Sequence, residues 1–162
     1  VVTGHARDAV EAQVQSFPVT LAYNPDYKSG QQSSVRVGLT ALSGNFDAVF
    51  VVLADQPLIG AGDLTELIAA FKKRPGGHVL VPMVNGQRGN PIVLDATARA
   101  DILASGTNLG CRNLIERQPE LVSVHTSTNT RFITDLDTAE DVQHLAQRTG
   151  WKLELPAEAV AS

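Results

Sequence analysis

The order of elements in this sequence predicts an α/β fold in which helices cover a mostly parallel sheet. Short apolar segments, typical of strands, alternate with longer segments in which apolar residues recur every three or four positions, as on one face of a helix. Residues 48–54 form an unbroken apolar run, which is typical of a strand buried on both faces. Strands separated by helices in this rhythm indicate right-handed β-α-β units, and hence parallel strands.

The first half of the chain contains this regular alternation. Its predicted elements are a strand at 1–4, a helix over 6–16, a short strand over 19–23, a helix capped by Ser33 or Ser34, the strand 48–54, and a helix capped by Asp63. The cap at Asp63 is inferred because Glu66 follows three residues later, which is the spacing of a capping box.

The pattern changes after Gly77. Two predicted strands, 79–84 and 92–94, flank a turn-rich loop over 85–91. The remaining predicted elements are helices near 96–103 and 111–118, a strand near 121–125, a segment at 131–133, and a helix over 139–148 that ends at Gly150. Residues 1–150 are therefore predicted to form one domain, and 151–162 a loosely held tail.

Composition excludes several classes of function. A net charge of −4 over 162 residues argues against a general affinity for nucleic acid, which requires a basic face. The sequence contains no apolar window of about 20 residues that could span a membrane, and no leader resembling a signal peptide. The single cysteine, Cys111, excludes an internal disulfide and any CxxC pair. These features predict a soluble cytoplasmic protein.

Asp55 is the first candidate site residue, because it directly follows the apolar run 48–54 and precedes Gln56 and Pro57. In open α/β sheets, ligands bind at the carboxyl ends of the strands. Asp55 therefore stands where a phosphate-bound metal ion would lie. The alternative is a carboxylate that only caps a turn.

Four motifs follow one another along the chain. They are Asn24-Pro25-Asp26-Tyr27-x-x-Gly30-x-x-x-Ser34-Val35-x-x-Gly38-Leu39, then Ala54-Asp55-Gln56-Pro57, then Pro82-x-x-x-Gly86-x-x-Gly89-x-Pro91, and finally Asp135-Leu136-Asp137-Thr138-Ala139-Glu140-Asp141. Their order and spacing resemble the molybdenum cofactor cytidylyltransferases, within the wider group of MobA-like nucleotidyltransferases. This resemblance implies a Rossmann-like three-layer sandwich and an enzyme that, with Mg²⁺, transfers CMP from CTP to the terminal phosphate of molybdopterin and releases pyrophosphate.

By this resemblance, Asp55 matches the first metal-binding carboxylate and Asp137 the second, with Asp135 as the substitute. Displacement at an α-phosphate requires the triphosphate charge to be neutralised and the reacting groups to be held in line. Mg²⁺ commonly uses one or two carboxylates, with phosphates and waters as its other ligands. The alternative for Asp137 is a helix cap, paired with Glu140.

The resemblance also implies two substrate-binding segments. Gly30, Ser33 and Ser34 match the nucleotide-binding segment, and Ser34 is expected to contact the cytosine, since related methylerythritol-phosphate cytidylyltransferases carry a similar Ser-Val-x-x-Gly-Leu motif. The alternative is that Ser34 only caps the helix. The loop containing Gly86, Arg88, Gly89 and Pro91 resembles the one that faces the pterin substrate, and Arg88 could pair with its phosphate. The alternative is a hairpin turn with a solvated arginine.

One family motif is missing, the glycine-rich loop that binds the triphosphate and follows the first strand. The resemblance places that strand between the strands at Val1 and Val49, so the sequence is expected to be an N-terminally incomplete domain, inactive alone, in which unpaired sheet edges let copies associate. Two alternatives remain open. One is another NTP transferase, with GTP as donor or a sugar or alcohol phosphate as acceptor. The other is a non-catalytic module that delivers cofactor to a molybdoenzyme.

Overall fold

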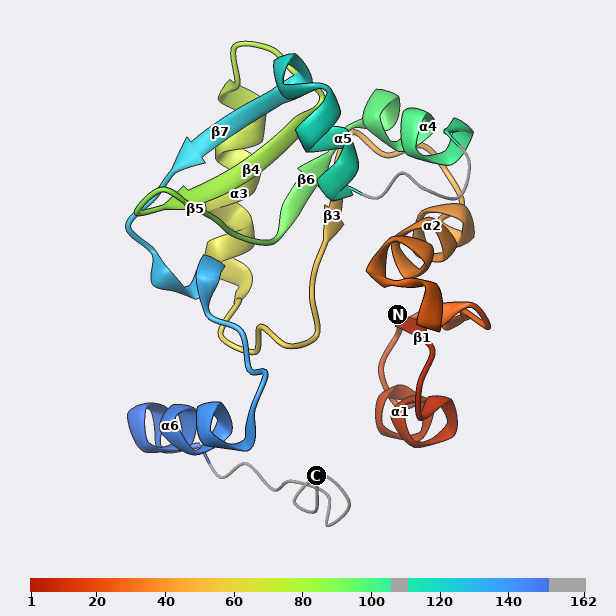
Figure 1. Ribbon diagram of the computed structural model, residues 1–162, viewed down its shortest axis with the longest axis vertical. Helices are drawn as coiled ribbons and strands as arrows, with labels where there is room; N and C mark the ends of the chain where they lie inside the picture. The colour runs from red at the N-terminus through yellow and green to blue at the C-terminus, as the bar shows by residue number, and fades with distance from the viewer. Residues whose placement is uncertain (106–110, 152–162) are drawn as a thin grey trace.

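The computed structural model describes residues 1–105 and 111–151, apart from the side chains of residues 112 and 113 (Figure 1). The predicted tail beyond Trp151 lies outside these residues. Within the described part of the chain, no helix is long and apolar enough to cross a membrane.

The larger of two sheets contains five strands. They are β3 (Val49–Val51), β4 (Val79–Val84), β5 (Gln87–Arg88), β6 (Ile92–Leu94) and β7 (Val122–Thr126). The order is β3-β6-β4-β5, and β7 pairs with β4. Strand β6 runs antiparallel to both β3 and β4, β5 runs antiparallel to β4, and β7 runs parallel to β4.

The prediction of a mostly parallel sheet is therefore wrong, because this sheet is mixed and largely antiparallel. Strands β3 and β4, joined by a helix, do run in the same direction, as the pattern of alternating elements predicted. However, the short loop after β4 reverses the chain, and short connections produce antiparallel neighbours. The returning strand β6 then lies between β3 and β4 and separates them.

A smaller two-stranded sheet holds the N-terminal part of the chain. Strands β1 (Val2–Thr3) and β2 (Ala22–Tyr23) are parallel and are connected through helix α1 (Arg7–Val14). The short 3₁₀ helix η1 (Tyr27–Ser29) and helix α2 (Gln31–Ala41) follow. In Figure 1, α2 lies between this small sheet and helix α4 (Ala96–Ala104), which belongs to the larger unit.

Helices cover both faces of the larger sheet. On one face, α3 (Ala61–Lys73) packs through Leu67 and Phe71 against Leu80 and Val93. On the other face, side chains from α2, α4 and α5 (Cys111–Arg117) pack against Val79, Val81 and Leu94. Alternate residues of a strand point to opposite faces, which is why Leu80 and its neighbours Val79 and Val81 belong to different cores.

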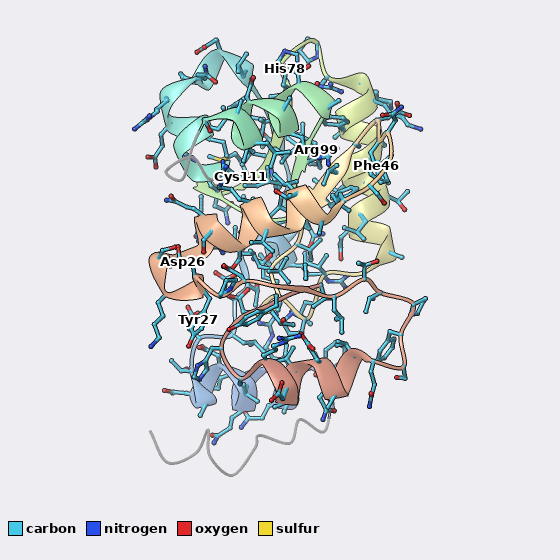
Figure 2. The ribbon with its side chains drawn as sticks, turned by 90° about the vertical axis from the view of Figure 1, so that its right-hand side faces the viewer. Asp26, Tyr27, Phe46, His78, Arg99 and Cys111 are labelled. Atoms are coloured by element: carbon cyan, nitrogen blue, oxygen red, sulfur yellow. The ribbon has the colours of Figure 1, made fainter. Side chains whose placement is uncertain are left out.

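Two arginines join α2 to α4. Arg99 donates through Nη2 to the carbonyl oxygens of Leu39 (2.9 Å) and Leu42 (2.7 Å), at the end of α2. Figure 2 shows Arg99 between the two helices. In the opposite direction, Arg36 of α2 donates to the carbonyl of Ile102 near the end of α4. Each helix therefore supplies a cation to the carbonyl end of the other, where the helix dipole is negative.

The remaining elements are the 3₁₀ helices η2 (Pro119–Leu121) and η3 (Thr130–Ile133) and the helix α6 (Ala139–Thr149), which Gly150 ends in the left-handed conformation as predicted.

The predicted caps of helices α2 and α3 are wrong by three or four residues. Helix α2 is capped by Gly30, so Ser33 and Ser34 lie inside its first turn. Helix α3 is capped by Gly60, whose N–H donates to Asp63 Oδ2 at 2.8 Å. In a capping box the acidic residue stands three positions after the cap, so Asp63 closes the box instead of opening it.

The cap of α6 differs from the alternative interpretation of Asp137 in a similar way. Thr138 is the cap, and Asp141 is its partner in the box. The alternative interpretation of Asp137, as a cap paired with Glu140, is therefore wrong, and the Asp137 side chain is not used in this capping box.

Candidate nucleotide and metal site

The chain brings Asp55 next to the segment 135–137, although 80 residues separate them in sequence. Strand β3 ends at Val51, earlier than predicted, and Asp55 lies in the turn that follows. The N–H of Leu136 donates to the carbonyl oxygen of Asp55 at 2.9 Å. This bond fixes the backbone of Asp135 and Asp137 beside Asp55.

Asp55 is affected both by its burial and by the charges of the other two carboxylates. Burial raises the pKa of Asp55 most, and the neighbouring charges of Asp135 and then Asp137 raise it further. A cation bound beside Asp55 would favour the charged form of its carboxylate, which burial and these neighbours disfavour. Among the described residues, no three His, Cys, Asp or Glu side chains converge closely enough to hold a metal ion unaided. Carboxylate oxygens nevertheless suit Mg²⁺, which takes its other ligands from phosphate and water.

Gln56 links the two segments and was not singled out from the sequence, although it lies in one of the quoted motifs. Its side chain is 4% exposed, and Nε2 donates to Asp135 Oδ1 at 2.5 Å and to the carbonyl of Phe132 at 3.3 Å. The sequence signal available was a second polar residue, directly after Asp55, at the edge where ligands bind.

The start of α2 is organised by Asn24, which is 1% exposed. Asn24 Nδ2 donates to Ser33 Oγ at 2.7 Å and to Ser34 Oγ at 3.0 Å. Ser33 Oγ in turn donates to a backbone carbonyl, that of Gly30 (2.8 Å) or Asp26 (3.0 Å). Ser34 Oγ accepts from Asn24, and in the described part of the chain its own hydrogen is donated to no other group.

Two adjacent cavities lie against α2 and β3. The first, of about 560 Å³, runs between α2, β1 and residues 49–54, and Ser34 and Ala54 both line it. The second, of about 460 Å³, lies between α2, β3 and the loop 85–91, and Arg88 and Gly89 line it. Gln31, Val35, Val51 and Leu53 line both cavities. Two ligands bound in these cavities would therefore be neighbours.

The loop 85–91 is largely explained by its own structure. Asn85 and Gly86, with φ of 51° and 80°, form the two-residue turn of the β4–β5 hairpin, where positive φ is required. The turn of the hairpin alternative is therefore present, while the predicted substrate contact of Arg88 stays a prediction. Gly89 packs so tightly that a Cβ there would overlap the carbonyl oxygen of Phe132.

Arg88 and Pro91 are the other predicted residues of this loop. The Arg88 guanidinium is half-exposed and lies 3.9 Å from Glu116, so it remains accessible from the second cavity. Pro91 follows Asn90 through a cis peptide bond.

Cys111 also lines the second cavity, and its placement is visible in Figure 2. The side chain is 6% exposed, and burial raises the pKa of its thiol to about 11. A thiol that remains protonated at neutral pH is a poor nucleophile, so Cys111 contributes packing to this cavity.

The family model for the MobA-like NTP transferase domain matches residues 1–122. This chain belongs to that family. The match includes Gly30, Ser33, Ser34, Asp55 and the loop 85–91, whereas Asp135 and Asp137 lie beyond it. The resemblance inferred from the four motifs is confirmed at the level of the MobA-like group. No curated protein matches the sequence significantly.

Solved structures show the same nucleotidyltransferase-like fold. Rv0371c from Mycobacterium tuberculosis H37Rv, in complex with manganese, superposes with a TM-score of 0.68 at 19% identity, covering 90% of this chain and 76% of that one. The 4-diphosphocytidyl-2C-methyl-D-erythritol synthase from Anaerococcus prevotii gives a TM-score of 0.68 at 12% identity, covering 93% and 78%. Molybdopterin-guanine dinucleotide biosynthesis protein A from Archaeoglobus fulgidus gives 0.64 at 14% identity, covering 92% and 78%.

Proposed function

We propose that this domain transfers CMP from CTP to the terminal phosphate of a molybdopterin-type acceptor. The observation that carries the proposal is the backbone bond that brings the segment 135–137 to Asp55, in a chain of the NTP transferase family. Leu53, two residues before Asp55, lines both of the adjacent cavities. A transferase requires two substrates in contact, and adjacent cavities with a shared wall provide for this.

Asp55 is proposed to hold a divalent cation together with Asp137, or with Asp135 in its place. When bound, Mg²⁺ would neutralise triphosphate charge and help orient the α-phosphate. The carboxylates supply the protein's share of the ligands, and the backbone bond from Leu136 to Asp55 keeps them adjacent.

The nucleotide is proposed to lie against the start of α2, in the first cavity. The segment from Gly30 through Ser34 offers hydroxyl and backbone N–H groups, and a free hydroxyl hydrogen on Ser34 can be donated to cytosine O2 or N3. The acceptor is proposed to lie in the second cavity, where Arg88 can pair with its phosphate.

The test is pyrophosphate release by the protein as its gene encodes it, with each NTP and molybdopterin. We expect CTP to be preferred and Asp55→Ala to lower turnover about a thousandfold without unfolding the protein, because the triphosphate charge loses its metal ligand. Asp47→Ala, at an exposed aspartate outside the site, is the matched control.

Equal activity with GTP would refute the cytidine assignment, which matters because one structural neighbour is named for guanine dinucleotide synthesis. An active Asp55→Ala variant would refute the metal role. Turnover with a sugar phosphate but not with molybdopterin would refute the acceptor.

A further inference from the structure

Gln56 is buried at the point where Asp55 meets the C-terminal segment. Its amide nitrogen donates to the Asp135 carboxylate at 2.5 Å and to the carbonyl of Phe132 at 3.3 Å, so one side chain holds η3 and Asp135 together. Gln56 directly follows Asp55 in the chain, so its bond to Asp135 holds the Asp135 carboxylate close to Asp55.

The Gln56 amide is only partly hydrogen-bonded, and this lowers the stability of the fold. Its Oε1 is buried and has no hydrogen-bond partner among the described residues. Buried side-chain acceptors are nearly always paired, and an unpaired one lowers stability. Methionine has a similar length and would fill the space without this cost. The benefit of glutamine at this position therefore lies in what its Nε2 holds.

The residue that Nε2 holds stands directly before Leu136, whose N–H donates to the carbonyl oxygen of Asp55 at 2.9 Å. In the part of the chain that the structure describes, the Asp135 carboxylate is held by the Gln56 amide, whereas the Asp137 carboxylate accepts no hydrogen bond. Asp135 is exposed, so water could solvate its carboxylate if the amide were absent. The bond from Gln56 is thus not needed to satisfy Asp135, but it does restrict where its carboxylate lies.

We propose that Gln56 is a positioning residue: its amide orients Asp135 beside Asp55, so that Asp55 and Asp135, rather than Asp55 and Asp137, form the carboxylate pair for a divalent cation. This rests on the proposed metal role of Asp55 and decides between its two candidate partners.

The test measures cation binding directly. Mn²⁺ is titrated into the ¹⁵N-labelled chain, and the midpoint of paramagnetic broadening is followed at the amide of Leu136, which lies between the two acids. Removing a group that orients a metal ligand typically costs about tenfold or more in affinity. We expect Gln56→Met to raise the Mn²⁺ midpoint about tenfold while its Tm stays equal to or above that of the wild type. Gln118→Met, at an exposed glutamine in the turn after α5, should change neither value.

Three further variants separate this inference from the proposed function. Asp135→Asn keeps an acceptor for the Gln56 amide but loses the charge, so we expect a larger loss of Mn²⁺ binding than with Asp137→Asn. If Asp55→Asn binds Mn²⁺ as the wild type does, the proposed metal role itself is wrong. If Asp55→Asn loses binding but Gln56→Met retains it, or if Asp137→Asn is the more damaging variant, only the role of Gln56 is overturned. A fall in Tm for Gln56→Met with an unchanged midpoint would show that the residue is merely structural.

Discussion

Strand β4 and the N-terminal unit, residues 1–23, both contain many apolar residues, but these residues are buried to very different degrees. In β4, Val79 and Val84 are 0% exposed and Leu80 is 2% exposed, because helices cover both faces. In the N-terminal unit, Val1 is 51% exposed and Phe17 is 61% exposed. Helix α1, which connects β1 and β2, contains no buried residue.

This difference in burial indicates where the candidate site lies relative to the core. The larger sheet is a packed scaffold, whereas the candidate nucleotide contacts lie on α2, at the boundary between the scaffold and the poorly covered unit. The cavity of about 560 Å³ at this boundary is lined by β1 on one side and by residues of β3 on the other. In the described part of the chain, β1 pairs only with β2 and β3 only with β6, so each strand has an unpaired edge.

The largest expected effect tests the contrast in packing. Leu80→Ala removes a side chain from the core between β4 and α3, and we expect it to lower the free energy of unfolding by about 3 kcal/mol. Leu21→Ala, at a leucine that is 38% exposed beside β2, should cost less than about 1 kcal/mol. Urea denaturation of both variants measures the difference. Equal costs would show that the small unit is packed as well as the scaffold.

A second, smaller contrast between the two regions is how much stability each loses as the pH falls. Burial alone would raise the pKa of Asp63, but hydrogen bonds from Gly60 N–H and Asn129, together with Arg131, lower it overall. A carboxylate whose pKa is lowered by folding stabilises the protein above its unfolded pKa of about 3.9, and this contribution is lost as the pH falls through the folded value.

We therefore expect Asp63→Asn to lower stability at pH 7 by about 1 kcal/mol, and to reduce the loss of stability between pH 5 and pH 3. Glu11→Gln in the N-terminal unit removes a carboxylate whose pKa is lowered by an exposed bond from Arg7 and a partly buried bond from Thr3. With fewer and more exposed partners than Asp63 has, its effect should be smaller. Thermal unfolding across this pH range measures both. An effect of Glu11→Gln as large as that of Asp63→Asn would mean that the two regions respond equally to acid.

The sequence predicted the existence of most elements, because apolar periodicity depends on local burial. It predicted that a helix joins two strands of the same direction, β3 and β4, but it could not show that β6 would lie between them. The order of strands within a sheet depends on contacts distant in sequence, which a pattern of apolar residues does not contain. Helix caps were misplaced for a local reason: an acidic residue that closes a capping box was interpreted as the residue that opens it.

Some residues of the candidate site could also be proposed from the sequence, whereas others could not. Asp55 could be proposed from its place after an apolar run, and Asp135 and Asp137 from the family motif. The role of Gln56 could not, since it depends on a contact across 79 residues. Gly86 and Gly89 illustrate the reverse case, because the hairpin turn and the approach of Phe132 account for them without any substrate.

The smallest expected change in stability tests what covers the cavity between β1 and β3. Because strands with unpaired edges recruit other strands, we expect the 162-residue chain to self-associate and to bind CTP weakly.

Val52 is 52% exposed and lines this cavity, so Val52→Lys should place a charge at the edge and yield a monomer, at a cost within about 0.5 kcal/mol. Val124→Lys is the matched control, since Val124 is 58% exposed on β7, at the other edge of the larger sheet. Sedimentation of the three proteins decides between the edges: a monomer formed only by Val52→Lys places the association at the cavity, whereas a monomer formed only by Val124→Lys places it at β7. A monomeric wild type that binds CTP tightly would contradict this prediction, because the unpaired edges of β1 and β3 would then neither recruit another copy nor weaken nucleotide binding.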